Sequence, residues 1–283
     1  MLPICLHDKN EIESLLRGDN VSLHLYEIGD LDEAFWPHTT WYTLPEKGPK
    51  PVLLLYSGLS RPTLLGLTKQ YPVPLANLIR MTIPLLPVSF YAHLSPGLSV
   101  EFKEPYGVEP RGGFYRMILR DRNRLEDIDT ADVIPLGIEQ AAELKHFFQM
   151  SYPGHWFEPH MMKTGCYCGI RRDTKLVCAA GVHVHSPARR VAALGNVATH
   201  PQHRNQGLAR TACARLCRDL LKTVDDIGLN VKADSPAAIA CYRRLGFKPA
   251  AVYEEHMIDA RPEAQEPSRQ VCDLRPVDGD PIP

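Results

Sequence analysis

In the second half of this 283-residue chain, a strand-like segment and a helical segment meet at one glycine. Residues 191–199, VAALGNVAT, are typical of a strand, and apolar residues recur at every fourth position from 208 to 220, as in a helix with one buried face. The join is HPQHRNQGLAR, residues 200–210, with Gly207 inside it. A helix start leaves about four backbone amides without partners and carries partial positive charge. The join is therefore a candidate binding site for a phosphate or pyrophosphate. A glycine that only makes the turn would give the same spacing.

The segments before this join predict an antiparallel meander. CYCGIRRDTKLVCAAGVHVHS, residues 166–186, indicates two strands joined at residues 172–174, and residues 191–199 add a third strand. Three strands in such close succession favour antiparallel pairing.

The segments after the join predict a strand, a helix and a last strand. Residues 227–231 alternate as in a strand, and residues 251–258 suit the last one. The helix between them is defined by its ends. Ser235 can accept a hydrogen bond from a free amide, Pro236 suits the first helical position, and Gly246 can adopt the left-handed conformation that ends many helices.

The first half of the chain is also expected to fold as an α+β unit. Its residues 113–120 could form a strand, and residues 74–83 are helical or mixed. A charged segment, residues 120–132, suggests a boundary and gives three expected parts, 1–125, 126–260 and a loosely ordered tail at 261–283. The segments expected as strands are VSLHLYEI at 21–28, TTWYTL at 39–44, PVLLLYSGL at 51–59 and VSFYAHL at 88–94.

Composition excludes several classes of function. The 32 basic and 33 acidic residues give a net charge of −1, so no bulk charge draws the chain to nucleic acid or to an anionic membrane. No apolar run reaches the roughly 20 residues of a membrane helix, and the first residues do not resemble a signal peptide. A cytoplasmic protein with free thiols is expected. The cysteine spacings, at 166 and 168 and at 213 and 217, lack the repeated pairs of a zinc site, and we expect no metal.

The common phosphate-binding motifs are absent from the sequence. There is no GxxxxGK[ST] segment and no GxGxxG segment that opens a βαβ unit. The join at 200–210, in contrast, resembles the acyl-CoA-binding segment of the GNAT superfamily of N-acetyltransferases, whose core pattern is R/Q-x-x-G-x-G/A. The matching residues are Arg204, Asn205, Gln206, Gly207, Leu208 and Ala209.

A second segment strengthens this resemblance. SPAAIACYRRLGF, residues 235–247, is similar to the family pattern N-x-x-A-x-x-x-Y-x-x-x-G-F at Ala238, Tyr242, Gly246 and Phe247. Ser235 stands where the family has Asn, which weakens one expected contact to the cofactor. The resemblance covers roughly residues 134–259.

The resemblance implies an α+β fold of two GNAT-like domains, each with a mixed, mostly antiparallel sheet flanked by helices. In the second domain a central pair of strands would splay apart, and the first domain would be degenerate, without a cofactor motif. Acetyl-CoA would be the acyl donor. The amides of residues 206–209 would hold its pyrophosphate, with Arg204 adding charge. The remaining residues expected at the cofactor are Asn196, Val197, Ala198 and Thr199 along the pantetheine, and Ser235 and Ala238.

The reaction that the resemblance implies is direct attack of an amine on the thioester in a ternary complex. Tyr242 matches the general acid of the family, although a tyrosine that only packs against the sheet would look the same. The amide of Ala198 is the expected oxyanion donor. The family often has a Glu on the central strand, but residues 191–199 contain none. His183, His185 and Glu158 are the candidate bases, and a water chain is the alternative.

The sequence does not identify the acceptor amine. Trp156 and Phe157 could line an acceptor pocket or cap the core, and the first half is expected to shape that site. Small amines and protein amines both fit, with no nucleic acid and no membrane as partners, and a homodimer is an option. A protein that binds acetyl-CoA as a sensor without turnover is the alternative function, since the strand lacks Glu and Ser235 departs from the pattern.

Overall fold

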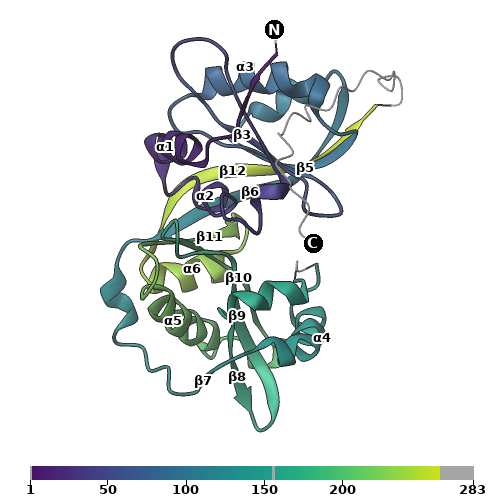
Figure 1. Ribbon diagram of the computed structural model, residues 1–283. Helices are drawn as coiled ribbons and strands as arrows, with labels where there is room; N and C mark the ends of the chain where they lie inside the picture. The colour runs from purple at the N-terminus through teal and green to yellow at the C-terminus, as the bar shows by residue number, and fades with distance from the viewer. Residues whose placement is uncertain (1, 155–156, 262–283) are drawn as a thin grey trace, which may run out of the picture.

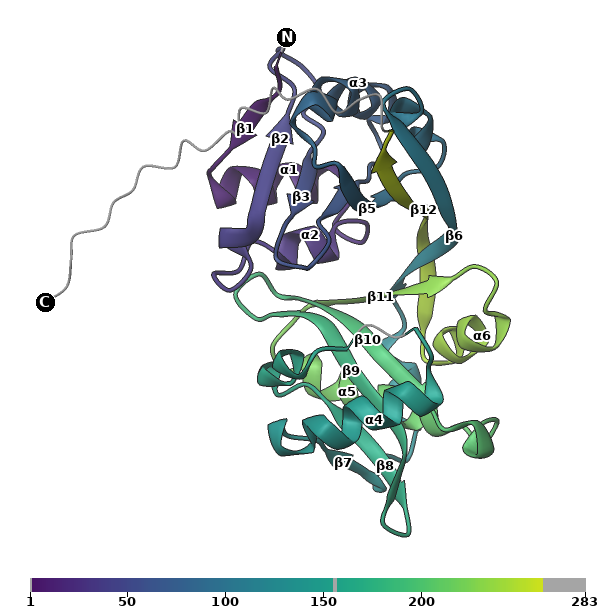
Figure 2. The same ribbon diagram turned by 90° about the vertical axis from the view of Figure 1, so that its right-hand side faces the viewer.

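The computed structural model describes residues 2–154 and 157–261. Their strands form one twelve-stranded sheet in the order β1-β2-β3-β4-β5-β12-β6-β11-β10-β9-β8-β7. Figures 1 and 2 show two lobes along this sheet, with the long strands β6 and β12 passing from one lobe to the other.

The elements of the first lobe come mostly from the first half of the chain. They are β1 (Ile4–Leu6), α1 (Lys9–Asn20), α2 (Leu25–Gly29), β2 (Thr39–Thr43), β3 (Leu53–Tyr56), β4 (Thr63–Gly66), α3 (Pro72–Thr82), β5 (Ser89–Leu94) and β6 (Tyr106–Leu119). The elements of the second half are β7 (Val133–Pro135), α4 (Ala141–Ser151), β8 (Cys168–Arg172), β9 (Lys175–Ser186), β10 (Val191–Thr199), α5 (Leu208–Leu220), β11 (Asp226–Lys232), α6 (Pro236–Arg244) and β12 (Phe247–Ala260). Short 3-10 helices, η1 to η7, connect several of them.

The two halves repeat one topology. Strands β1 to β4 pair antiparallel in sequence order, and so do β7 to β10. A helix then leads to a parallel neighbour in each half, through α3 from β4 to β5 and through α5 from β10 to β11. The expected fold of two GNAT-like units, each with a mixed sheet and flanking helices, is confirmed.

The long strand that ends each half pairs with a strand of the other half. Strand β6 pairs with β11 through residues 114–118, although it follows β5 in the chain. Strand β12 pairs with β5 through residues 254–259, although it follows β11 and α6. The predicted boundary near residue 125 therefore separates β6 from β11 and β12, its two neighbours in the sheet, and its position stays a prediction.

Helices cover both faces of the sheet in the second half. Helices α5 and α6 pack on one face with a core that includes Cys213, Leu216 and Ile239. Helix α4 packs on the other face through Phe147 and Phe148. Figure 2 shows α4 in front of β8 to β10 and α5 behind them. Helices α1 and α2 of the first half continue this second face, because their core includes side chains of β9 and β10.

One expected strand is wrong. Residues 21–24 form a turn and α2 follows, where the sequence predicted a strand over 21–28. The alternation of Val21, Leu23 and Leu25 suggested a strand. Helical spacing decides instead, because Leu25 and Ile28 share one buried face. The other expected strands of the first half, and the helix at α3, are confirmed.

Candidate active site

Strands β10 and β11 diverge in the middle of the second lobe. They pair in parallel only from Val191–Asp226 to Leu194–Leu229. Beyond Leu194 the pairing of β10 with β9 is also irregular, and Asn196 there has φ of 53°. The last five residues of β10 therefore have no partner on the β11 side. This is the splayed pair that the resemblance implied.

The start of α5 lies directly after this divergent edge. Its N-cap is Gly207 with φ of 79°, and the first helical hydrogen bond runs from the Thr211 amide to the Gly207 carbonyl at 3.1 Å. The amides of residues 207–210 therefore have no partner inside the helix. A Cβ at Gly207 would meet no atom within 4 Å, so the space beside the N-cap is open. The geometry fits an anion at the helix start.

The Arg204 guanidinium donates hydrogen bonds to two backbone carbonyl groups of the protein. Its Nε lies 3.3 Å from the Thr199 carbonyl oxygen and its Nη2 lies 3.0 Å from the Ser151 carbonyl oxygen. The guanidinium thus joins the end of β10 to the end of α4. Its expected contact with a pyrophosphate stays a prediction.

The expected cap of α6 is wrong in one respect. The Ser235 side chain makes no capping hydrogen bond, and its Oγ instead donates to Asp234 Oδ1 at 3.5 Å. Pro236 at the first position and Gly246 with φ of 97° at the end are as expected. The Ser235 hydroxyl therefore leaves the first amides of α6 uncapped.

Tyr242 lies on α6 and packs against the core between α5 and the sheet. Its ring meets Phe247 edge-on, with centroids 6.0 Å apart. Burial, together with the thiols of Cys213 and Cys241 and with Tyr152 and Tyr26, raises the Tyr242 pKa well above its ordinary value. Within the described residues the Tyr242 hydroxyl makes no hydrogen bond. The phenol is therefore protonated at neutral pH and able to donate a proton.

The three candidate bases occupy different places. The His183 ring lies against Gly195 of β10, and burial lowers the His183 pKa to about 4 despite a hydrogen bond with Asn196. His185 lines a pocket of about 210 Å³ beside the C-terminal half of α5, far along the helix from Gly207. Glu158 is exposed before η6 (Pro159–Thr164). Of the three, the structure brings only His183 to the divergent strands.

The two aromatic residues expected near an acceptor pocket have different outcomes. Phe157 is buried and packs on Phe148 and Tyr167, with ring centroids 5.1 Å and 5.9 Å away. It therefore belongs to the core. Trp156 lies outside the described residues.

Sequence reasoning missed an arginine of the first half that contacts the divergent strands. Arg116 on β6 is fully buried, and its Nε donates to Asn230 Oδ1 at 3.1 Å. Asn230 follows directly after the last β10–β11 pair at Leu229. The guanidinium also lies 3.1 Å from Glu27 Oε2 and 4.8 Å from the ring centre of Tyr26. One arginine inside the apolar run FYRMIL was the only signal in the sequence.

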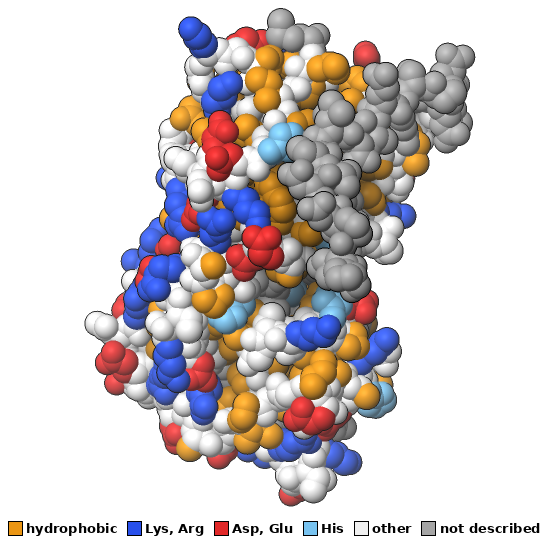
Figure 3. All heavy atoms as spheres, viewed as in Figure 1, with side chains coloured by type: hydrophobic (Ala, Val, Ile, Leu, Met, Phe, Trp, Pro, Cys, Tyr) orange, Lys and Arg blue, Asp and Glu red, His pale blue; other side chains and the backbone are white. Residues whose placement is uncertain are grey.

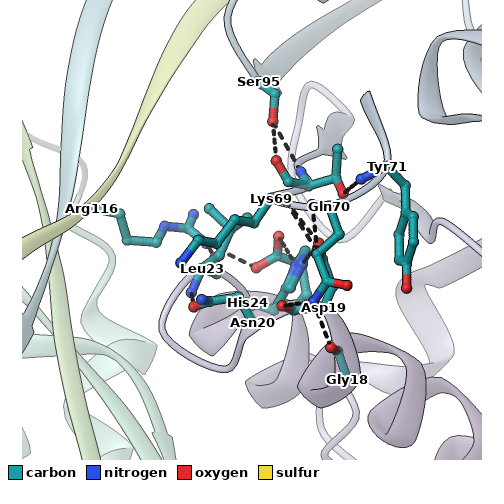
Figure 4. Close-up of polar contacts among 12 residues, drawn as sticks. Gly18, Asp19, Asn20, Leu23, His24, Lys69, Gln70, Tyr71, Ser95 and Arg116 are labelled. Carbon is teal, nitrogen blue, oxygen red and sulfur yellow. Dashed lines mark hydrogen bonds and ion pairs between the residues drawn. The ribbon is translucent and has the colours of Figure 1, made fainter. Parts of the chain in front are cut away.

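The loop that leads into the corresponding helix of the first half, α3, is hydrogen-bonded within the protein. The carboxylate of Asp19 accepts hydrogen bonds from the amides of Lys69, at 3.1 Å, and Gln70, at 3.0 Å, in the loop between β4 and α3 (Figure 4). Burial alone would raise the Asp19 pKa, but hydrogen bonds from His24 and the loop outweigh it and lower the pKa. An internal carboxylate therefore occupies two backbone amides directly before the N-cap of α3.

No helix of the described residues is long and apolar enough to cross a membrane. In the same part of the chain, no group of three or more His, Cys, Asp or Glu side chains could hold a metal ion.

Comparisons with known proteins agree with this geometry. Residues 136–247 match the model of the acetyltransferase (GNAT) family. The chain resembles the structure of a Drosophila protein, with a TM-score of 0.68 and 15% identity over 91% of this chain and 98% of that one. It also resembles a GNAT acetyltransferase from Colwellia psychrerythraea, with a TM-score of 0.56 and 12% identity over 92% and 100% of the two chains.

A third similar structure is a tandem GNAT protein from the clavulanic acid biosynthesis pathway. Its TM-score is 0.54, with 14% identity over 92% of this chain and 98% of that one. No curated protein matches the sequence. At these identities the structures support the fold alone, and the family match carries the assignment. Residues 136–247 form an acetyltransferase domain of the GNAT family, in a chain that has the fold of two GNAT-like units.

Proposed function

We propose that this protein is an acyl-CoA-dependent N-acyltransferase that moves the acetyl group of acetyl-CoA to a primary amine. The observation that carries the proposal is the divergence of β10 from β11 directly before the open helix start at Gly207. The amides of residues 206–209 would hold the pyrophosphate. The free edge of β10, at residues 196–199, would pair with the pantetheine, and the thioester would then lie between the divergent strands.

The reaction runs by direct attack in a ternary complex. The neutral amine forms a bond to the thioester carbonyl carbon and the carbon–sulfur bond breaks. The departing thiolate takes the proton of the Tyr242 hydroxyl, and a proton lost from the new amide nitrogen restores the phenol through solvent. The amide of Ala198 stabilises the oxyanion. Water removes the first proton from the ammonium, since His183 is a weak base at its low pKa.

A second candidate function is a sensor that binds acetyl-CoA without turnover. Two observations favour it: β10 carries no Glu, and the candidate base that lies at the divergent strands, His183, has a pKa of about 4.

One assay separates the two functions. Release of the CoA thiol is followed with acetyl-CoA and a panel of amines, beside calorimetric titration with CoA. The enzyme predicts thiol release above the buffer rate for at least one amine. Tight binding of CoA with no release for any amine would establish the sensor instead, and no binding at all would contradict both functions.

A further inference from the structure

Glu255 on β12 is a carboxylate within a group of aromatic side chains. Its side chain is 12% exposed. Its Oε1 accepts a hydrogen bond from the Tyr253 hydroxyl at 2.9 Å, and its Oε2 accepts one from the Tyr91 hydroxyl. His93 Nε2 lies 3.5 Å from Oε1. Three side chains of β5 and β12 therefore hold this carboxylate in place.

No cation of the described residues neutralises Glu255. Burial lowers the His93 pKa, so its imidazole is neutral at neutral pH. No Lys or Arg in the described part of the chain forms an ion pair with Glu255, and the nearby Arg116 is paired with Glu27. Carboxylates with so little exposure usually have a cationic partner, because loss of water is costly for an isolated charge.

The same face of the sheet carries further polar atoms without partners. Register places Glu255, Arg116 and Asn230 on one face, because Arg116 pairs with Asn230 and with Ala251, four residues before Glu255. On this face His93 Nδ1 and Arg116 Nη2 are buried with no hydrogen-bond partner among the described residues. Such groups are rare in native structures, and a bound ion or an ordered water is one way to satisfy them.

The position across from Glu255 on β6 is open on this face. Gly112 lies directly across from Glu255 on β6, and a Cβ added there would meet no atom within 4 Å. Figure 1 shows α2, which carries Tyr26, close to β6, β12 and β11. The face therefore extends from the divergent strands, across Arg116, to Glu255.

We propose that Glu255 binds a cationic group of the acceptor, and that the acceptor is an aliphatic diamine whose other amine reacts. Strand β12 is two strand spacings from β11, so the two cationic groups are about 10 Å apart. The tyrosine rings around Glu255 add favourable cation–π contacts. This inference rests on the proposed N-acyltransferase function and names its substrate class.

The test compares two acceptors that differ in one charge. Thiol release from acetyl-CoA is measured with diaminoheptane and with heptylamine, for the wild type, Glu255→Gln and Glu254→Gln. Gln keeps an oxygen for the tyrosine hydroxyls and removes the charge. Glu254 is the matched control, because it is adjacent in sequence and points to the opposite face. Circular dichroism and calorimetry with CoA check that each variant folds and binds the donor.

For the wild type, kcat/KM should be about 10- to 100-fold higher with diaminoheptane than with heptylamine, as one charge-assisted hydrogen bond would give. Glu255→Gln should bring the ratio close to one through a higher KM for the diamine. Glu254→Gln should keep the wild-type ratio.

The outcomes separate this inference from the proposed function. Turnover of heptylamine without a preference for the diamine would overturn the inference and leave the N-acyltransferase in place. A preference that survives in Glu255→Gln, or that is also lost in Glu254→Gln, would overturn it too. Absence of thiol release with every amine would overturn both proposals.

Discussion

At Gly207 two requirements fall on a single residue. The backbone has φ of 79°, which L side chains rarely adopt, and the amides that follow must stay open to a ligand. Gly207→Glu would bring both strain and a carboxylate that competes for those amides. We predict that CoA binding is lost in calorimetry while circular dichroism shows a folded protein.

The variant Gly97→Glu is a matched control that separates backbone strain from loss of the anion-binding site. Gly97 has φ of 83°, and a Cβ there also meets no atom within 4 Å, but it lies before η3 (Leu98–Phe102) in the first half. Gly97→Glu should carry a similar backbone cost and keep CoA affinity. Unchanged affinity in a folded Gly207→Glu variant would mean that the start of α5 does not hold the phosphates.

Tyr242 lends itself to a change of one atom. Tyr242→Phe removes the hydroxyl and keeps the edge-on contact with Phe247. If the phenol protonates the departing thiolate, kcat should fall by about 10²–10⁴-fold, while CoA affinity stays the same. Steady-state kinetics with calorimetry measures both quantities. An unchanged kcat across the pH range would leave Tyr242 with a packing role only.

Helix α2 and the turn before it carry a buried group of charges. His24 Nε2 lies 2.9 Å from Asp19 Oδ2, and His24 Nδ1 lies 3.2 Å from Glu27 Oε1. Glu27 in turn pairs with Arg116, which reaches Asn230 on β11. The loop before α3 and the divergent strand β11 are therefore joined by one chain of polar contacts. Figure 4 shows the part of it from Asp19 to Arg116.

This chain predicts a pH dependence of stability. Burial alone would lower the His24 pKa, but hydrogen bonds to Asp19 and Glu27 outweigh it and raise the pKa above the ordinary value of about 6.5. A raised folded-state pKa stabilises the protein fully below pH of about 6.5, and this contribution is lost as pH rises through the folded-state value. The difference in unfolding free energy between the wild type and His24→Gln should therefore be larger at pH of about 6 than at about 9.

Urea unfolding at the two pH values measures this difference. His146→Gln serves as the control, because His146 is an exposed histidine of α4 and should show no such change. A difference between wild type and His24→Gln that stays constant or grows with pH would contradict a charged His24 in the folded protein.

The elements that sequence predicted well are those with local signals. The turn at Asp173, with φ of 56°, and the helix end at Gly246 follow from the residues at those positions. The strand expected at 21–28 failed because alternation over a few residues did not reveal the buried helical face of Leu25 and Ile28. The prediction that Ser235 caps α6 was wrong because its hydroxyl donates to the neighbouring Asp234 carboxylate instead.

The parts of the site that the sequence could not predict depend on contacts between distant segments. The motif around Gly207 predicted the helix start, but nothing near Arg116 or Glu255 in sequence shows that they share a face with Asn230. Asp19 binds the loop before α3 from 50 residues away. Such pairings follow from the order of strands in the sheet, which local patterns do not determine.

At the scale of the whole molecule, the exchange of β6 and β12 makes each lobe depend on the other. Strand β6 fills the sheet between β11 and β12, and its Met117 and Leu119 belong to the core of α5 and α6. A space-filling view shows both lobes forming one continuous surface (Figure 3). The domain that the family match covers, residues 136–247, therefore lacks a central strand of its own sheet.

This dependence predicts how fragments behave. A fragment of residues 129–283, cut near the boundary that the sequence suggested, leaves facing edges of β11 and β12 unpaired and uncovers apolar side chains of the α5 core. Because open, apolar strand edges promote aggregation, we expect this fragment to be insoluble or unfolded and to bind no CoA. A fragment of residues 104–283 restores β6 to its place and should be more soluble, with a larger folded fraction by circular dichroism. Calorimetry with CoA on both fragments completes the test. A soluble, folded 129–283 fragment with full CoA affinity would show that β6 is dispensable and that the second half is an independent domain.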